Sequence, residues 1–190
     1  MNKKTENKIL KESIDCILDT IDDSLEDLEL DKINRAVDIL TSSDHVFIYG
    51  SGRSGLVGRT FAMRLMQLGL NSFFIGETIT PAVQDGDCVF LVSKTGETQT
   101  AIQAARIVEN RVPKAEIIVV TASPDSTLAE FGDINIILDI KDKEEDQKLA
   151  PLGTIFEDSA MIFLDGLVSV LMEDLDEEVD DMKYRHPILI

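Results

Sequence analysis

The sequence predicts an α/β protein in which a five-stranded parallel sheet lies between two layers of helices. Two observations carry this prediction. Short runs rich in Val and Ile alternate with longer segments of helical periodicity, as expected for strands that are joined through helices. These runs are apolar at nearly every position, which is typical of strands covered on both faces. With 190 residues, the chain is long enough for one domain with a sizeable core.

The N-terminal part of the chain contains two stretches of helical periodicity. Apolar residues recur every three or four positions in 5–21 and again in 30–40, and the polar segment 22–24 predicts a break between the two helices. We therefore interpret 1–35 as a helical extension and 36–190 as one domain. The polar start lacks the apolar region of a signal peptide, which predicts a cytoplasmic protein.

Strands and helices are then expected in alternation. The expected strands are 45–49, 71–75, 88–92, 116–121 and 134–138. The expected helices are a segment from the loop 50–55 to about Leu68, then 97–111, a short helix beginning at 123–126, and 154–173. The charged segment 141–148 is expected to form a loop.

Two loops rich in glycine and hydroxyl residues follow the first and third expected strands. They are Gly50-Ser51-Gly52-Arg53-Ser54-Gly55 and Ser93-Lys94-Thr95-Gly96-Glu97-Thr98. A strand-to-helix turn of this kind leaves backbone N–H groups unpaired at a helix N-terminus, and such groups bind phosphate. The hydroxyls of the second loop are equally compatible with a helix cap. Because ligands bind at the carboxyl ends of parallel strands, we expect both loops to contribute to one site.

The formal net charge of −18 argues against nucleic acid and anionic membranes as partners. It also opposes a phosphorylated ligand at long range, so that local cations such as Arg53 and Lys94 must supply the attraction. Otherwise the excess of acidic residues is typical of a solvated surface. No segment is long and apolar enough to be expected to span a bilayer.

The first loop also matches the G-x-G-x-x-G pattern of dinucleotide-binding proteins through Gly50, Gly52 and Gly55. Glu77, which follows the second expected strand, is a tolerable candidate to hold a ribose. The second loop has no function in a nicotinamide site, however, and the first loop carries Arg53 and two serines in place of a bare glycine turn. A phosphorylated ligand other than a dinucleotide is therefore favoured.

Several segments resemble the sugar isomerase (SIS) domain family. The loop 93–98 is similar to the phosphosugar-binding loop of this family, although Lys94 stands where the family more often has a small residue. The segments that resemble the 6-phospho-3-hexuloisomerase group are 50–65, 76–81, 151–157 and the Arg185-His186 tail. The resemblance covers nearly the whole chain from about residue 36 and implies a flavodoxin-like, three-layer α/β/α fold.

The resemblance implies an isomerase that converts D-arabino-hex-3-ulose 6-phosphate to D-fructose 6-phosphate in the ribulose monophosphate pathway of formaldehyde metabolism. A carboxylate would take the proton at C2, an enediol would form, and the proton would return at C3, without a metal or an organic cofactor. Members of the family are commonly homodimers or homotetramers. Two alternatives remain open: another phosphosugar isomerase of the aldose–ketose type, or a non-catalytic phosphosugar-binding protein, which would need no base.

The resemblance also implies the site residues. Glu157 is the candidate general base, although an acid early in a helix is also favourable for structural reasons alone. His186 is the second catalytic candidate, in its own site or in that of a neighbouring subunit. The predicted substrate-binding residues are Ser51, Gly52, Arg53, Ser54, Ser93, Lys94, Thr95, Gly96, Glu97 and Thr98. The second loop would hold the phosphate, and Arg53 would stabilise the charge of the enediolate. No metal-binding residues are expected.

Overall fold

The structure, a computed structural model, describes residues 3–141 and 147–188. In this part of the chain, five parallel strands form one sheet with the spatial order β2-β1-β3-β4-β5. The strands are β1 (Val46–Gly50), β2 (Ser72–Phe74), β3 (Cys88–Val92), β4 (Glu116–Thr121) and β5 (Ile134–Ile137). The predicted sheet is therefore confirmed.

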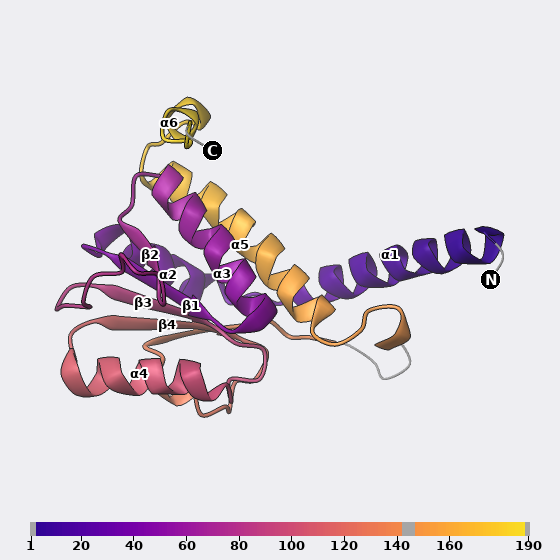
Figure 1. Cartoon of the computed structure of the whole chain (residues 1–190), viewed down its shortest axis with the longest axis horizontal. Helices are drawn as coiled ribbons and strands as arrows, with labels where there is room; N and C mark the ends of the chain where they lie inside the picture. Colours follow the sequence, from indigo (N-terminus) through magenta and orange to yellow (C-terminus); the bar gives the residue numbers. More distant parts are fainter. Residues whose placement is uncertain (1–2, 142–146, 189–190) are drawn as a thin grey trace.

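Helices cover both faces of the sheet (Figure 1). The helices that the structure describes are α1 (Lys3–Leu25), α2 (Leu30–Ser42), α3 (Gly52–Gln67), α4 (Gln99–Arg111), α5 (Thr154–Asp174) and α6 (Val179–Tyr184), with a 3₁₀ turn, η1 (Ala129–Phe131). Successive strand residues point to opposite faces, so that Ile48 packs with α2, α3 and α5 and Phe47 packs with α4. Among the described helices, none has both the length and the apolar character needed to cross a membrane.

The direction in which strands are added to the sheet reverses between β1 and β3. From β1 the chain passes through α3 to the outer strand β2, whereas from β3 it passes through α4 to β4 on the other side. The last residues of the two strands, Gly50 and Val92, are paired. The loops that follow β1 and β3 therefore begin side by side, at the kind of crevice where open α/β sheets bind ligands.

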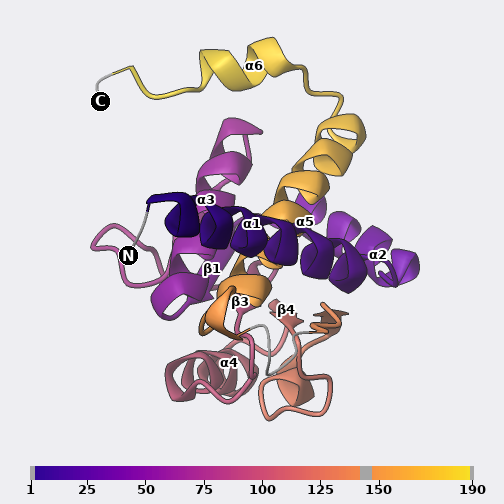
Figure 2. The same ribbon diagram turned by 90° about the vertical axis from the view of Figure 1, so that its right-hand side faces the viewer.

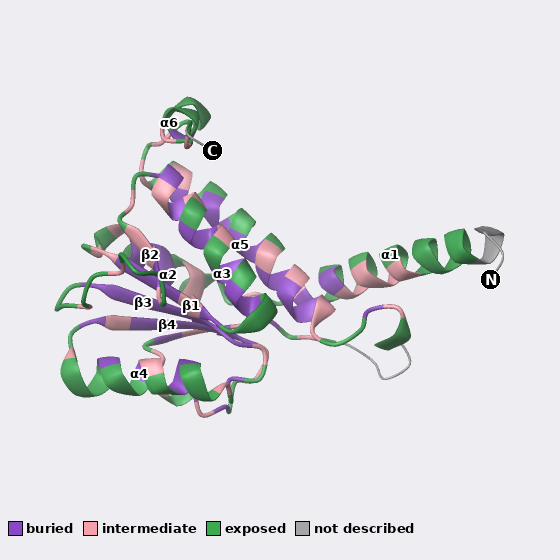
Figure 3. Ribbon diagram, in the orientation of Figure 1, coloured by how far each residue is buried: buried purple, intermediate pink, exposed green. Residues whose placement is uncertain are grey.

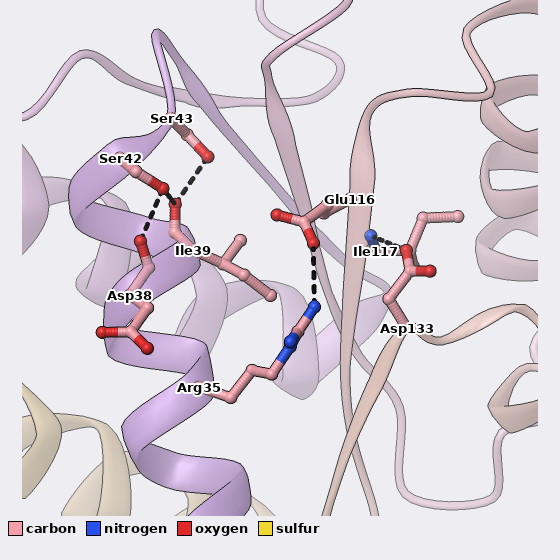
Figure 4. A network of polar contacts seen from close by, with 8 residues as sticks. All are labelled: Arg35, Asp38, Ile39, Ser42, Ser43, Glu116, Ile117 and Asp133. Atoms are coloured by element: carbon pink, nitrogen blue, oxygen red, sulfur yellow. Dashed lines mark hydrogen bonds and ion pairs between the residues drawn. The ribbon is translucent and has the colours of Figure 1, made fainter.

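An ion pair joins α2 to the start of β4, at the amino ends of the strands (Figure 4). A guanidinium nitrogen of Arg35 lies 3.6 Å from the carboxylate of Glu116, at the start of β4. Asp133 accepts a backbone N–H of the same strand at 2.8 Å. The hydroxyls of Ser42 and Ser43 donate to the carbonyl oxygens of Asp38 and Ile39 at the end of α2, both at 2.6 Å.

The N-terminal helix α1 projects beyond the rest of the domain (Figures 1 and 2). Its C-terminal part packs against α5, and the hydroxyl of Ser13 donates to the carbonyl oxygen of Leu149 at 2.6 Å. Its N-terminal half is largely exposed (Figure 3). The boundary predicted after residue 35 lies within α2, and the division into extension and domain stays a prediction.

The predicted break at 22–24 is wrong, because α1 continues to Leu25. Asp and Ser have low helix propensity, which led to the prediction. In the structure, however, Ser24 is buried and donates its hydroxyl to the carbonyl of Thr20 at 2.6 Å. Tertiary packing therefore outweighs the local preference.

The short helix predicted to begin at 123–126 is also wrong. This segment forms turns, and only the 3₁₀ turn η1 follows it. The hydroxyls of Thr121 and Ser123 donate to the carbonyl oxygen of Lys94 in the second loop at 3.1 and 3.4 Å, and these contacts hold the segment in a non-helical path. The predicted loop 141–148 lies partly outside the described residues, at 142–146.

Cys88 is completely buried in β3. Burial raises the pKa of its thiol well above the usual range, because the protein interior disfavours the thiolate. A buried thiol of this kind is unreactive, which makes Cys88 a structural residue of the core.

Candidate functional site

The first loop turns directly into α3. Ser51 is the N-cap residue, and Gly52 opens the helix with φ 57°, a left-handed conformation that favours glycine. Arg53 and Ser54 therefore belong to the first helical turn rather than to an extended loop. A Cβ on Gly50 would lie 2.6 Å from the carbonyl oxygen of Ser54, so the glycine pattern serves a tight turn.

Glu157 lies early in α5, beside this turn, and only 8% of its surface is exposed. The hydroxyl of Ser54 donates to Glu157 Oε1 at 3.0 Å. Arg53 Nε lies 3.4 Å from Glu157 Oε2, and Arg53 Nη2 lies 3.3 Å from an oxygen of Asp158. One guanidinium thus lies between two carboxylates, of which only that of Glu157 is buried.

A cavity of about 190 Å³ adjoins this cluster. Three charged side chains line it, those of Arg53, Glu157 and Asp158. The rest of the lining is apolar and consists of Leu56, Val57 and Met161. A carboxylate with one oxygen held by a hydroxyl can accept a proton from a ligand, and the neighbouring guanidinium can stabilise negative charge that develops there. The arrangement is therefore suited to taking a proton from a bound ligand.

The backbone of the second loop is held by the segment that follows β4. The carbonyl oxygen of Lys94 accepts hydrogen bonds from the N–H of Ala122 at 3.0 Å and from the hydroxyl of Thr121 at 3.1 Å. The carbonyl oxygen of Gly96 accepts the N–H of Leu128 at 3.0 Å. These contacts fix the loop against the sheet.

Glu97 contributes to the same connection. Its carboxylate accepts the backbone N–H of Thr127 at 2.8 Å and the hydroxyl of Thr127 at 2.9 Å. Gly96, with φ 62°, packs against Ser126, where a Cβ would lie 1.9 Å from the hydroxyl oxygen. In this structure Glu97 therefore connects two loops of the protein.

The hydroxyls of the second loop gather at the start of α4. Ser93 Oγ and Thr98 Oγ1 lie 3.1 Å apart, and Thr95 Oγ1 accepts the backbone N–H of Glu97 at 3.2 Å. Thr98 is the N-cap residue, but its side chain makes no capping hydrogen bond. The N–H groups of Ala101 and Ile102 bond to the carbonyl oxygen of Thr98, so that an anion would meet the N–H groups of the residues before Ala101.

The structure brings the two loops together. Because Gly50 pairs with Val92, the next residues, Ser51 and Ser93, leave neighbouring strands about 5 Å apart. The contacts of Ser54 and Arg53 with Glu157 and Asp158 also join the N-terminal turn of α5 to that of α3. The partial positive charge of these helix N-termini attracts an anion locally, in spite of the net charge of −18.

His186 lies far from this cluster in the same chain. It lines a second cavity of about 350 Å³, together with residues from the C-terminal halves of α3 and α5. The α5 residues of that cavity, from Asp165 to Met172, lie between about 12 and 22 Å from Glu157 along the helix axis, at 1.5 Å per residue. Within one chain, the structure does not bring the two catalytic candidates together.

The tail that carries His186 is anchored by Arg185. The guanidinium donates to both carboxylate oxygens of Glu177 at 2.6 and 2.8 Å, and to the carbonyl oxygen of Gln67 at 3.1 Å. Hydrogen bonding to Glu177 raises the pKa of Arg185. The exposed ring of His186 follows directly, so the protein presents this imidazole at its surface.

The other arginines of α3 form ion pairs. Arg59 pairs with Glu77, the residue considered for ribose binding, and its guanidinium carbon lies 3.9 Å from the centroid of the Phe74 ring. Arg64 lies 3.5 Å from Asp165. Glu77 is thus engaged by the protein itself, which weakens the dinucleotide interpretation further.

Sequence reasoning did not find the contact between Ser54 and Glu157. The two side chains are 103 positions apart, and no local pattern in the sequence marks their hydrogen bond. It also did not find that Asp158 shares Arg53 with Glu157. Adjacent acids at a helix start were the only signal, and they suit a structural role equally well.

Comparison with known proteins identifies the family. The SIS domain matches residues 39–164. The chain is 36% identical to the 3-hexulose-6-phosphate isomerase of Methanocaldococcus jannaschii, with 82% of each protein covered. It is 34% identical to the 3-hexulose-6-phosphate isomerase of Methylomonas aminofaciens, over 82% of this chain and 84% of that protein.

A solved structure extends the comparison to nearly the full length. It is that of a hypothetical protein from Methanococcus jannaschii, for which a function of 3-hexulose-6-phosphate isomerase was inferred. It is 32% identical and has a TM-score of 0.79, covering 98% of this chain and 99% of the other. The chain therefore belongs to the SIS domain family. The predicted resemblance is confirmed, and the named relatives place the chain among the isomerase enzymes of this family.

Proposed function

We propose that this protein converts D-arabino-hex-3-ulose 6-phosphate to D-fructose 6-phosphate, with Glu157 as the general base. The observation that carries the proposal is the buried carboxylate of Glu157, held by Ser54 and adjacent to Arg53. It lies at the edge of the sheet where the hydroxyl-rich second loop also begins. The names of the relatives supply the substrate.

The second loop is proposed to bind the phosphate. The hydroxyls of Ser93, Thr95 and Thr98 and the backbone near Gly96 surround the N-terminus of α4. Hydroxyl and N–H donors at a helix N-terminus are favourable for a phosphate dianion. Lys94 is proposed to add positive charge nearby.

The proposed chemistry is a proton transfer between two adjacent carbons. The carboxylate of Glu157 takes the proton from C2, the electrons of the C–H bond form the C2–C3 double bond, and the C3 carbonyl becomes an enediolate oxygen. Arg53 stabilises the charge on that oxygen. The proton then returns to C3, the proton of the C2 hydroxyl passes to the oxygen on C3, and C2 becomes the carbonyl carbon. A single carboxylate serves both steps, and the proposal calls for no metal or organic cofactor.

The remaining predicted binding residues are given these roles within the proposal. Ser51 and Gly52 contact the sugar from the N-terminus of α3. Ser54 and Glu97 direct their polar atoms toward Glu157 and Thr127 in this structure. Their contacts with the substrate stay predictions. The observed contacts support a role for Ser54 in holding the base and a role for Glu97 in holding the second loop.

A homo-oligomer, either a dimer or a tetramer, forms part of the proposal. The exposed side of α1 carries an apolar stripe, with Leu10, Ile14 and Leu18 exposed to 61%, 47% and 57%. A second copy of the chain would cover such a stripe. His186 is remote from Glu157 in its own chain, which supports a role for it in the site of a neighbouring subunit. The cytoplasm and the ribulose monophosphate pathway stay the predicted setting.

One assay tests the proposed reaction. The hexulose phosphate is prepared enzymatically from ribulose 5-phosphate and formaldehyde, the protein is added, and fructose 6-phosphate is followed with a coupled dehydrogenase. Turnover is expected with the wild-type protein. Absence of product at high protein concentration would overturn the proposal, and turnover of arabinose 5-phosphate in its place would favour the aldose–ketose alternative.

The role of His186 has its own test. The variants Glu157→Gln and His186→Ala are each expected to be inactive as homo-oligomers. They are mixed under conditions in which subunits exchange. If His186 acts in a neighbouring site, mixed oligomers contain sites with both native residues and regain activity. A mixture that stays inactive although the subunits have exchanged would contradict that assignment.

A further inference from the structure

Gly153 lies directly beneath the carboxylate of Glu157. It is the N-cap residue of α5, with φ −88° and ψ 11°. This conformation is open to residues other than glycine. Backbone geometry therefore gives no reason for a glycine at this position, and the reason must be sought in the space around its α-carbon.

That space is filled by the side chain of Glu157. A Cβ built on Gly153 would lie 2.2 Å from Glu157 Oε2, 2.9 Å from Cδ and 3.0 Å from Oε1. All three atoms belong to the carboxyl group. Any side chain at position 153 would therefore have to displace this carboxylate from its present position.

The carboxylate has few alternatives that keep its contacts. Oε1 is held by the hydroxyl of Ser54 at 3.0 Å, whereas Oε2 is buried without a hydrogen-bond partner and has Arg53 Nε at 3.4 Å. A rotation that relieves a clash at Gly153 moves both oxygens. The hydrogen bond with Ser54 would then be lost, because its geometry is narrow.

We infer that Gly153 is a positioning residue for the general base: its lack of a side chain lets Glu157 fold back over the start of α5 into reach of Ser54. This inference rests on the proposed function for its kinetic consequence, but not for its structural one. A displacement of about 1 Å of a catalytic group can lower the rate about 100-fold.

The test compares Gly153→Ala and Gly153→Ser with Gly166→Ala. Serine is a favourable N-cap residue, so the serine variant preserves capping while adding a Cβ. Gly166 lies on the same helix, and a Cβ there meets no atom within 4 Å. Both variants at position 153 should fold, since the displaced atoms are the end of a flexible side chain.

In the kinetic arm, kcat for the hexulose phosphate should fall about 100-fold in both Gly153 variants. KM should change little, because the phosphate is bound elsewhere, and Gly166→Ala should keep the wild-type kcat. In a Glu157→Gln background, Gly153→Ala should have no further effect on residual turnover, since the group through which it acts is gone.

In the structural arm, glutamate is labelled with ¹³C, and the carboxyl resonance of Glu157 is assigned as the one absent from Glu157→Gln. The resonance should move in both Gly153 variants and stay in place in Gly166→Ala. An unmoved resonance, or a wild-type kcat in the Gly153 variants, would overturn the inference. If the wild-type protein has no turnover, the proposed function fails, and the resonance alone decides whether Gly153 positions the carboxylate.

Discussion

The two loops at the carboxyl edge of the sheet start from paired strands, yet their side chains contact different parts of the molecule. Ser54 and Arg53 of the first loop contact Glu157 on α5. The backbone and the acidic side chain of the second loop are bonded to the segment that follows β4. In the proposed function, the first loop therefore holds the reacting carboxylate, and the second presents hydroxyls and a helix N-terminus to the phosphate. Substitutions in the two regions should consequently change different kinetic constants.

The largest effect is expected from Glu157→Gln. An amide cannot take a proton from carbon, so kcat should fall by about 10³-fold or more, within the range of general-base contributions. The neighbouring Asp158→Asn should lower kcat far less, because Asp158 only shares Arg53. Steady-state kinetics measure both variants, and equal losses would remove the distinction between the two carboxylates.

A change in the second loop should affect binding. Thr95→Ala removes a hydroxyl proposed to donate to the phosphate, and a hydrogen bond to a charged group contributes about 1.5–3 kcal/mol. KM should therefore rise at least about tenfold with little change in kcat. Thr100→Ala, in the first turn of α4, is the control. A fall in kcat alone would show that the loops do not divide binding from chemistry.

A smaller change in the first loop should affect turnover. Ser54→Ala removes the hydroxyl that holds Glu157 Oε1. With about 1 kcal/mol for one hydrogen bond, kcat should fall about fivefold while KM stays near its wild-type value. If KM rises and kcat does not, Ser54 binds the sugar, as the sequence had suggested.

The smallest effect should come from Glu97→Gln. The carboxylate accepts two hydrogen bonds from Thr127, and the amide oxygen can keep part of this contact. The melting temperature should fall by about 2–4 °C, consistent with a loss of about 1 kcal/mol. Glu109→Gln, exposed on α4, serves as the control. A large rise in KM without loss of stability would instead make Glu97 a ligand of the substrate.

Most of the fold could be predicted because its signals are local. The strands are short apolar runs, and the turns after β1 and β3 carry their own glycines and hydroxyls. Prediction failed where packing decides the outcome. Ser24 is buried against the domain and stays helical, although its local sequence favours a break.

The site was predictable only in part. The loop residues could be selected from their composition, but Glu157 was selected through family resemblance, since an acid early in a helix is common. Its contact with Ser54 depends on the packing of α3 against α5. No spacing rule relates residues that are joined only by such packing.

The central claim is that the Glu157 carboxylate takes a proton from a carbon of the sugar. On the carboxyl group, this proton can exchange with the solvent. It is tested most directly by incubating fructose 6-phosphate with the protein in deuterium oxide and following the C3 proton by NMR. The wild-type protein should replace this proton with deuterium, and Glu157→Gln should not, although calorimetry shows that it still binds the sugar phosphate. Exchange by Glu157→Gln at the wild-type rate would contradict the account.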